Sequence, residues 1–180
     1  MKIVITGGPG TGKTSIIKAL KKKGFHIYPE VSREIINEYR KLGHKQLFLS
    51  DPLKFSEILM EKRIIQYKNS NENKNKFYFF DRGIPDIIAY LNFKKVKFNP
   101  SLLKEIKNYT YDLIFLCEPW KQIYINDSER YESYSELLLI NKELKKTYQK
   151  LDYKPIKLPE ISVEERVNYI LNSIKWNTKR

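Results

Sequence analysis

The chain has 180 residues, of which 41% are hydrophobic, and a formal net charge of +13 that comes mostly from lysine. This length and apolar content predict a single domain over residues 1–180, and the lack of any run of 18 apolar residues excludes a membrane-spanning helix. One cysteine, Cys117, excludes an intrachain disulfide and favours a reducing, cytoplasmic location; the first residues read as a core strand rather than a signal peptide.

Predicted strands and helices alternate along the whole chain. The expected strands are residues 2–6, 25–28, 77–80, 113–117 and 154–158. The expected helices carry apolar stripes at helical spacing and lie near residues 16–20, 35–39, 52–69, 84–91, 99–106, 137–151 and 163–174. Asp51-Pro52 and the capping boxes Ser133–Glu136 and Ser162–Glu165 mark three helix starts. The alternation predicts an α/β fold with a mostly parallel sheet.

The segment Gly7–Thr14 fits the pattern G-x-x-x-x-G-K-[ST] at every fixed position. An apolar strand, Lys2–Thr6, comes before it, and a helical stripe with Ile16, Ile17 and Leu20 comes after it. Glycines allow a tight turn and close approach to a phosphate, and the amides form an anion nest at a helix N-terminus. A strand and a helix in these places favour a phosphate-binding loop over a glycine-rich turn with a chance lysine.

This loop predicts binding of a nucleoside triphosphate, ATP with GTP left open. Lys13 would reach the β- and γ-phosphates, and the Thr14 hydroxyl would be a ligand of Mg²⁺. The residues expected to hold the nucleotide are Gly8, Pro9, Gly10, Thr11, Gly12, Lys13, Thr14 and Ser15.

Charged residues follow three of the predicted strands. Glu30 comes after the second, Asp81-Arg82 after the third and Glu118 after the fourth. Ligands of open α/β sheets bind at the carboxyl ends of the strands, so these residues are candidates for a functional site.

Together with the phosphate loop, further segments make the chain recognisable. They are Pro29-Glu30, Arg33-Glu34, residues 79–86, 111–116 and 119–120, and Tyr124, Asp127, Arg130, Glu132 and Ser133. With them the chain resembles a family of small P-loop AAA-type ATPase domains, related to the ribosylnicotinamide kinase domain of the bacterial NAD regulator and to the GTP-binding translocation-defect protein of insect photoreceptors. The resemblance implies a three-layer α/β/α fold of the nucleoside/nucleotide-kinase type. It also implies a five-stranded parallel sheet in the order 2-3-1-4-5 and a lid over about residues 120–133.

The resemblance also implies roles at the strand ends, beside Lys13. Glu30 would be a general base or would orient an acceptor hydroxyl, although a first-turn helix residue is the plainer alternative. Asp81 would hold Mg²⁺ together with Thr14. Arg82 would contact the acceptor or the transferred phosphate, and the alternative is an ion pair with Glu30 or Glu34.

Three further candidates complete the expected site. Arg130, on the lid, would stabilise charge on the γ-phosphate, unless it is a solvated arginine paired with Asp127 or Glu132. Arg33 would bind an anionic group of the acceptor. Asp86 would contact the acceptor or would only favour the first turn of a helix.

Two main functions remain open from the sequence, and an RNA-directed kinase or RNA-binding protein is a third that rests mainly on charge. The first is Mg²⁺-dependent transfer of the γ-phosphate of ATP to a small nucleoside-like acceptor, or simple NTP hydrolysis by the same residues. The second is a nucleotide-binding module with slow hydrolysis that docks on a protein, an anionic lipid surface or RNA. The charge of +13 suits polyanions, but scattered lysines are also ordinary on a solvated surface. There is no N-K-x-D motif of an ordinary GTPase and no room for the parts of a hexameric motor, so we expect a monomer or dimer.

Overall fold

A computed structural model describes residues 1–43, 46–70, 76–124 and 133–178. Its centre is a five-stranded sheet in which all neighbouring strands are parallel and the order is β2-β3-β1-β4-β5. The strands are β1 (Lys2–Thr6), β2 (His26–Tyr28), β3 (Tyr78–Asp81), β4 (Leu113–Cys117) and β5 (Ile156–Leu158). The α/β class, the parallel sheet and the order 2-3-1-4-5 are therefore confirmed.

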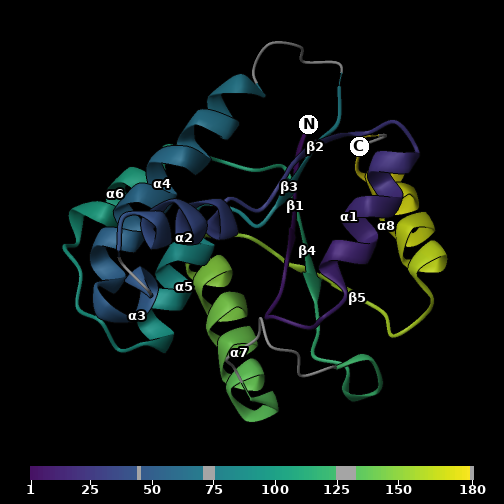
Figure 1. Ribbon diagram of the computed structural model, residues 1–180. Helices are drawn as coiled ribbons and strands as arrows, with labels where there is room; N and C mark the ends of the chain where they lie inside the picture. Colours follow the sequence, from purple (N-terminus) through teal and green to yellow (C-terminus); the bar gives the residue numbers. More distant parts are fainter. Residues whose placement is uncertain (44–45, 71–75, 125–132, 179–180) are drawn as a thin grey trace.

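Helices cover both faces of this sheet and give the predicted three layers (Figure 1). α1 and α8 pack against each other on one face, and α5 packs between α4 and α7 on the other. The helices are α1 (Lys13–Lys22), α2 (Ser32–Lys41), α3 (Leu47–Ser50), α4 (Pro52–Asn69), α5 (Asp86–Phe93), α6 (Ser101–Ile106), α7 (Tyr134–Lys150) and α8 (Val163–Thr178), with a 3-10 turn η1 (Lys121–Ile123).

The central strand β1 is apolar on both of its sides. Ile3 and Ile5 belong to the buried cluster that also contains Ile16 of α1 and Ile170 of α8. Val4 points the other way, into the cluster built on α4 and α5. Successive strand residues face opposite sides of a sheet, so a strand covered on both faces reads as a continuous apolar run.

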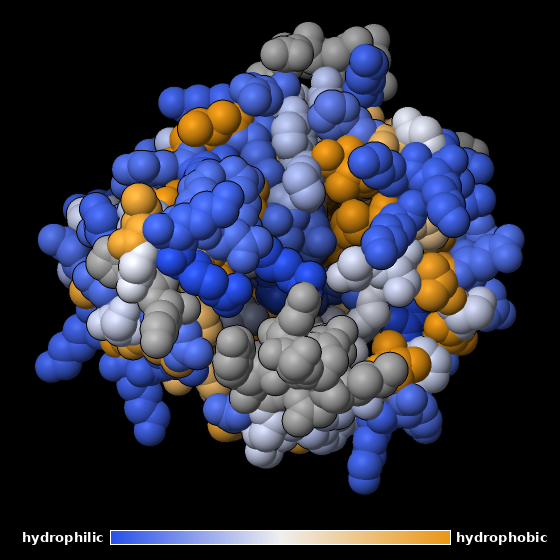
Figure 2. Space-filling model, viewed as in Figure 1, coloured by the Kyte–Doolittle hydropathy of each residue, from blue (hydrophilic) through white to orange (hydrophobic). Residues whose placement is uncertain are grey.

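The carboxyl ends of the strands define the edge where the candidate site lies. β1 is paired with β3 on one side and β4 on the other, with Ile5 opposite Asp81 and Thr6 opposite Leu116. The chain leaves β1 toward β2 but leaves β3 toward β4, and the crevice where such connections diverge is the usual ligand position in open α/β sheets. Figure 2 shows this side of the molecule hollowed at its centre and lined there by hydrophilic residues.

Helix starts follow the predicted capping. Asp51, which directly precedes Pro52, caps α4 by accepting a hydrogen bond from the Lys54 amide. Both predicted capping boxes form, one at Ser133 and one at Ser162. The short elements α3 and η1 were not predicted, because three or four residues are too few to show a periodic stripe.

The predicted lid and the expected absence of a membrane-spanning helix can be compared only with the residues that the structure describes. η1 opens the predicted lid of residues 120–133, but residues 125–132 lie outside the described ranges. None of the described helices is both long and apolar enough to cross a membrane.

Candidate active site

The segment Gly7–Thr14 joins the carboxyl end of β1 to α1, as predicted for a phosphate loop. Gly12 directly precedes α1 with φ of 84°, in the left-handed region that favours glycine. A Cβ on Gly7 would lie only 2.5 Å from the carbonyl oxygen of Cys117, so the loop runs too close to β4 for a larger residue. Two positions of the motif therefore need glycine for reasons visible in the fold.

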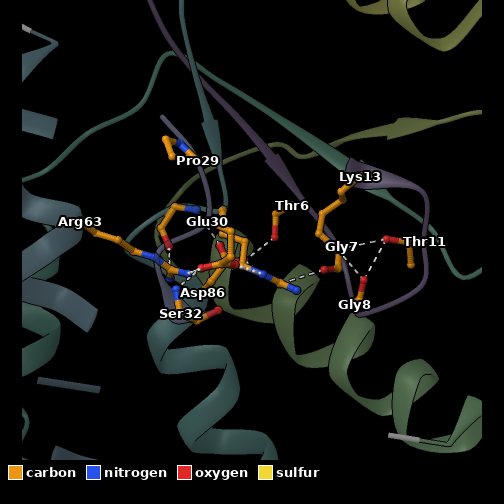
Figure 3. A network of polar contacts seen from close by, with 12 residues as sticks. Thr6, Gly7, Gly8, Thr11, Lys13, Pro29, Glu30, Ser32, Arg63 and Asp86 are labelled. Carbon is orange, nitrogen blue, oxygen red and sulfur yellow. Dashed lines mark hydrogen bonds and ion pairs between the residues drawn. The ribbon is translucent and has the colours of Figure 1, made fainter. Parts of the chain in front are cut away.

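Lys13 is the first residue of α1 and is only 7% exposed. Its Nζ donates to the carbonyl oxygen of Gly8 at 2.6 Å and to Oγ1 of Thr11 at 3.4 Å (Figure 3). Burial, and after it the positive charge of Arg82, lowers the pKa of Lys13 to about 8. A buried ammonium group that crosses a glycine-rich loop is unfavourable for the fold alone, but it suits phosphate oxygens.

The other residues expected to hold the nucleotide lie on the same loop. Pro9 and Gly10 are partly exposed, and Thr14 and Ser15 are exposed on the first turn of α1. Thr11 is buried, and its hydroxyl donates to a carbonyl of the loop at 2.9 Å. The loop thus combines backbone amides and hydroxyls at a helix N-terminus, an arrangement suited to an anion.

Asp81 is the last residue of β3, one strand away from the loop. Burial raises the pKa of its carboxyl group, and the positive charge of Lys13 opposes that rise. Within the described ranges no residue donates a hydrogen bond to the carboxylate of Asp81. Its oxygens therefore keep their capacity to accept from a ligand.

Asp81 and Thr14 are the predicted metal ligands, and both offer oxygen. Mg²⁺ prefers oxygen ligands, keeps several waters and is usually bound through one or two carboxylates together with substrate phosphates. Among the residues that the structure describes, no group of three or more His, Cys, Asp or Glu side chains could hold a metal ion. The donor set fits a magnesium ion that comes with phosphates rather than one enclosed by protein.

Glu30 follows β2 and is held between two arginines. Its Oε1 accepts from Nη2 of Arg63 at 3.0 Å and from the amide of Ser32 at 3.1 Å, and its Oε2 pairs with Nε of Arg82. Burial alone would raise the pKa of Glu30, but the charges of Arg63 and Arg82 outweigh it and lower the pKa. Glu30 is therefore a carboxylate at neutral pH.

Removal of the Glu30 carboxylate is expected to make the protein less stable at neutral pH, and the effect is expected to fade in acid. A lowered pKa in the folded state means that the stabilisation is present above the ordinary pKa of 4.5 and is lost as the pH falls through the folded value. Glu30→Gln should lower the free energy of unfolding at pH 7 by about 2–4 kcal/mol, since it breaks a buried ion pair. Urea unfolding of both proteins at pH 7 and at pH 3–4 measures this (the lower range lies about one unit below the ordinary value).

The difference between Glu30→Gln and the parent protein should shrink in the acidic series. Glu34→Gln is the control, because its pair with Lys62 at 2.6 Å is exposed and should matter little. A difference that stayed constant down to the acidic range would contradict the proposed charge state of Glu30.

Arg82 connects the phosphate loop with Glu30. Its Nη1 donates to the carbonyl oxygen of Gly7 at 2.9 Å and lies 3.5 Å from Oδ1 of Asp86, and its guanidinium carbon is 5.5 Å from the ring centre of Tyr90. Its backbone has φ of 74°, a left-handed conformation that costs a non-glycine residue about 1–3 kcal/mol. Strain of this kind is tolerated where surrounding contacts hold the residue in one orientation, as they do here.

Asp86, the first residue of α5, is 1% exposed and lies at the centre of a set of buried hydrogen bonds (Figure 3). Its oxygens accept from Oγ1 of Thr6 at 2.6 Å, from the hydroxyl of Tyr148 at 2.6 Å and from the amide of Gly83 at 3.1 Å. Each oxygen of Asp86 thus has two protein donors, since Nη1 of Arg82 also approaches Oδ1, whereas among the described residues Oε2 of Glu30 has Arg82 alone. The position matches the predicted first turn of a helix, and the geometry leaves little capacity for contact with an acceptor.

Tyr148→Phe is expected to lower the free energy of unfolding by about 1–3 kcal/mol, because it removes the shorter of the two hydrogen bonds to a buried carboxylate oxygen and leaves only the Gly83 amide there. Tyr148 is fully buried and its hydroxyl reaches Asp86 from α7. Thermal or urea unfolding measures the change, with Tyr169→Phe on the 40% exposed Tyr169 as the matched control. Equal stability of the two variants would show that the hydrogen bond contributes nothing.

The remaining candidates are less closely tied to this cluster. Arg33 is exposed in the first turn of α2. Glu118, after β4, accepts from Nδ2 of Asn141 at 2.6 Å and pairs with Nζ of Lys157 at 2.9 Å, away from the Glu30 cluster. Arg130 lies outside the described residues.

A family model described as an AAA domain matches residues 2–166 of this chain. The chain belongs to the AAA domain family. The matched range takes in the phosphate loop and the whole cluster around Glu30, Asp81 and Arg82. The AAA-type family resemblance read from the sequence is therefore confirmed.

Several known proteins that are similar to this AAA domain are kinases. Dephospho-CoA kinase of Helicobacter pylori is 37% identical over 76 residues, which are 40% of this chain and only 38% of that kinase. Deoxyadenosine kinase from M. mycoides, solved with dCMP and dCDP, has a TM-score of 0.70 at 19% identity and covers 97% of this chain and 99% of that one. Thymidylate kinase from Candida albicans has a TM-score of 0.64 at 15% identity, over 98% and 92%. The fold is that of P-loop nucleoside and nucleotide kinases.

Two buried arginines of this AAA domain were missed in the sequence. Arg63 is 4% exposed and donates to Glu30 and to the carbonyl oxygen of Gly83; Arg166 is 3% exposed and approaches the phosphate loop. Each lies in line with a buried stripe of its helix, Arg63 with Leu59 and Arg166 with Ile170. An arginine in register with a buried stripe was the available signal.

Proposed function

We propose that this protein is a Mg²⁺-dependent kinase that transfers the γ-phosphate of ATP to a small nucleoside-like acceptor. The observation that carries the proposal is that one side chain, Arg82, contacts both the phosphate loop and Glu30. Arg82 donates to Gly7 of the phosphate loop and pairs with Glu30 at the end of β2, with Asp81 next to it in the chain. Kinase neighbours that share the fold support this assignment.

The donor half would consist of the loop Gly8–Ser15 and Asp81. Lys13 would bind the β- and γ-phosphates, and Thr14 and Asp81 would hold Mg²⁺. Bound Mg²⁺ supplies positive charge that neutralises the phosphates as charge shifts toward the leaving group. The protein residues fix the donor in place, which is the main requirement of a loose transition state.

The acceptor half would lie beside Glu30, with Arg33 at its rim. Because Glu30 is ionised and held by Arg63, it would accept a hydrogen bond from the acceptor hydroxyl and orient its oxygen toward the γ-phosphorus. The new oxygen–phosphorus bond forms as the bond to ADP breaks, and the hydroxyl proton passes to Glu30 or to water. Arg82 would stabilise charge on the phosphoryl group in transit, joined by Arg130 from the lid.

Turnover by the purified protein tests the proposal. Mg²⁺·ATP and Mg²⁺·GTP are each incubated alone and with nucleosides, nicotinamide riboside, nucleotides or short RNAs, and products are read by mass for an added phosphate. One acceptor class should gain a phosphate. Tight nucleotide binding with slow, acceptor-independent hydrolysis would contradict the kinase and favour the nucleotide-dependent binding module that the charge of +13 also suits.

A further inference from the structure

Arg166 is a buried cation without a carboxylate partner in the described part of the chain. It is 3% exposed, and arginines so deeply buried are almost always paired. The two other arginines of this region follow that rule, since Arg63 and Arg82 both pair with Glu30. Arg166 makes no such pair with any residue in the described ranges, and its Nε is buried without a hydrogen-bond partner there.

The place of Arg166 in its helix adds to this cost. It lies in the first turn of α8, where the helix dipole disfavours a positive charge. Glu165, the neighbouring carboxylate, is engaged with the hydroxyl and amide of Ser162 in the capping box. The residues that the structure describes therefore leave the charge of Arg166 uncompensated.

Within the described part of the chain, the side chain of Arg166 contacts the phosphate loop and the start of the lid. Its Nη1 donates to the carbonyl oxygen of Thr11 at 3.4 Å, and its guanidinium carbon lies 4.8 Å from the ring centre of Trp120. A Cβ on Gly12 would lie 3.2 Å from Nη1 and 3.2 Å from Cδ1 of Ile123. The guanidinium thus packs against Thr11 and Gly12, the two residues that directly precede Lys13.

We propose that Arg166 is a positioning residue of the triphosphate site: it holds the Thr11–Gly12 peptide in place, and the negative charge of bound phosphates compensates its own. This rests on the proposed function, since it assumes that the loop binds a nucleoside triphosphate. Because Arg166 acts through the loop, its effect is on the binding of phosphate charge and not on recognition of the base.

Binding measurements on Arg166→Met test this, because methionine keeps an apolar stem beside Trp120 but removes the charge. Calorimetric titration with Mg²⁺·ATP and with Mg²⁺·tripolyphosphate, which has no base, should show both dissociation constants raised about 10- to 100-fold, the effect of one partly screened charge. The unfolding temperature of the free protein should stay the same or rise. Lys146→Met, which removes a 55% exposed charge on α7, should bind both ligands normally.

Arg166→Lys keeps the charge and should retain most of the affinity for both ligands. A fall in unfolding temperature with unchanged affinities in Arg166→Met would make Arg166 a packing residue and overturn the inference. Loss of ATP affinity with normal tripolyphosphate binding would also overturn it, since the side chain would then recognise the base. If Arg166→Met does not fold, Arg166→Lys decides the question. Affinities equal to those of the parent protein support the inference. A loss of affinity as large as about 10-fold, the lower limit of the expected charge effect, overturns it. Failure of the parent protein to bind ATP would instead sink the proposed function itself.

Discussion

Lys13→Met is expected to lower ATP turnover by about 10³-fold while it stabilises the free protein. Loss of a cation from a phosphoryl-transfer site typically has an effect of this size on turnover. The gain in stability arises because burial lowers the pKa of Lys13 from 10.5 to about 8, so the folded protein holds a charge that it disfavours. The expected gain at pH 7 is about 1–3 kcal/mol in the free energy of unfolding.

The pH dependence separates this account from a general effect of the substitution. Between pH 8 and 10.5 the unfolded chain binds more protons at Lys13 than the folded one, so the parent protein gains stability as the pH rises. The stability advantage of Lys13→Met should therefore close over this range. Lys18→Met, on the exposed side of α1, is the control and should change neither property. Unchanged turnover in Lys13→Met would refute the phosphate-loop assignment.

Asp81→Asn is expected to lower kcat in Mg²⁺ by about 10²–10³-fold and to leave the dissociation constant for ATP within a few fold. Asparagine keeps the shape of the side chain but removes the negative charge that a metal ion needs. The substitution should not destabilise the free protein, because burial already raises the pKa of Asp81 and disfavours its charge. Steady-state kinetics with calorimetric titration of ATP measures both quantities.

Asp112→Asn provides the matched control for this variant. Asp112 accepts from the amide of Lys2 at 2.6 Å, at the amino edge of the same sheet and away from the loop. Its replacement should leave turnover as it is. If Asp81→Asn keeps the parent rate over a range of Mg²⁺ concentrations, Asp81 has a structural role only.

Local pattern was enough to predict the phosphate loop and nearly all of the helices and strands. The loop is a short contiguous motif, and β1 and β4 are apolar on both sides, which requires cover on both faces. The strand order came from the resemblance to a family, because spacing alone does not determine which strands are neighbours. The charged residues at strand ends were found by the rule that ligands of open α/β sheets bind at the carboxyl ends of the strands. Glu30 and Arg82, two of these residues, do lie together.

Local sequence pattern could not predict the contacts between segments that are far apart in the chain. Asp86 was correctly placed at a helix start, but its partners Thr6 and Tyr148 are 80 and 62 residues away. Glu30 and Arg63 are 33 residues apart in the chain, and tertiary packing brings them together. In sequence, an arginine within a polar helix is indistinguishable from a solvated one unless its register with the buried stripe is noticed.

Transfer of phosphate to an acceptor is tested most directly by the balance of products. ATP labelled with ¹⁸O in the γ-phosphoryl group is turned over with the acceptor panel, and ADP, inorganic phosphate and labelled acceptor are counted by mass. A kinase gives labelled acceptor in equal amount to ADP, with little inorganic phosphate. ADP matched by inorganic phosphate under every acceptor condition would contradict the account.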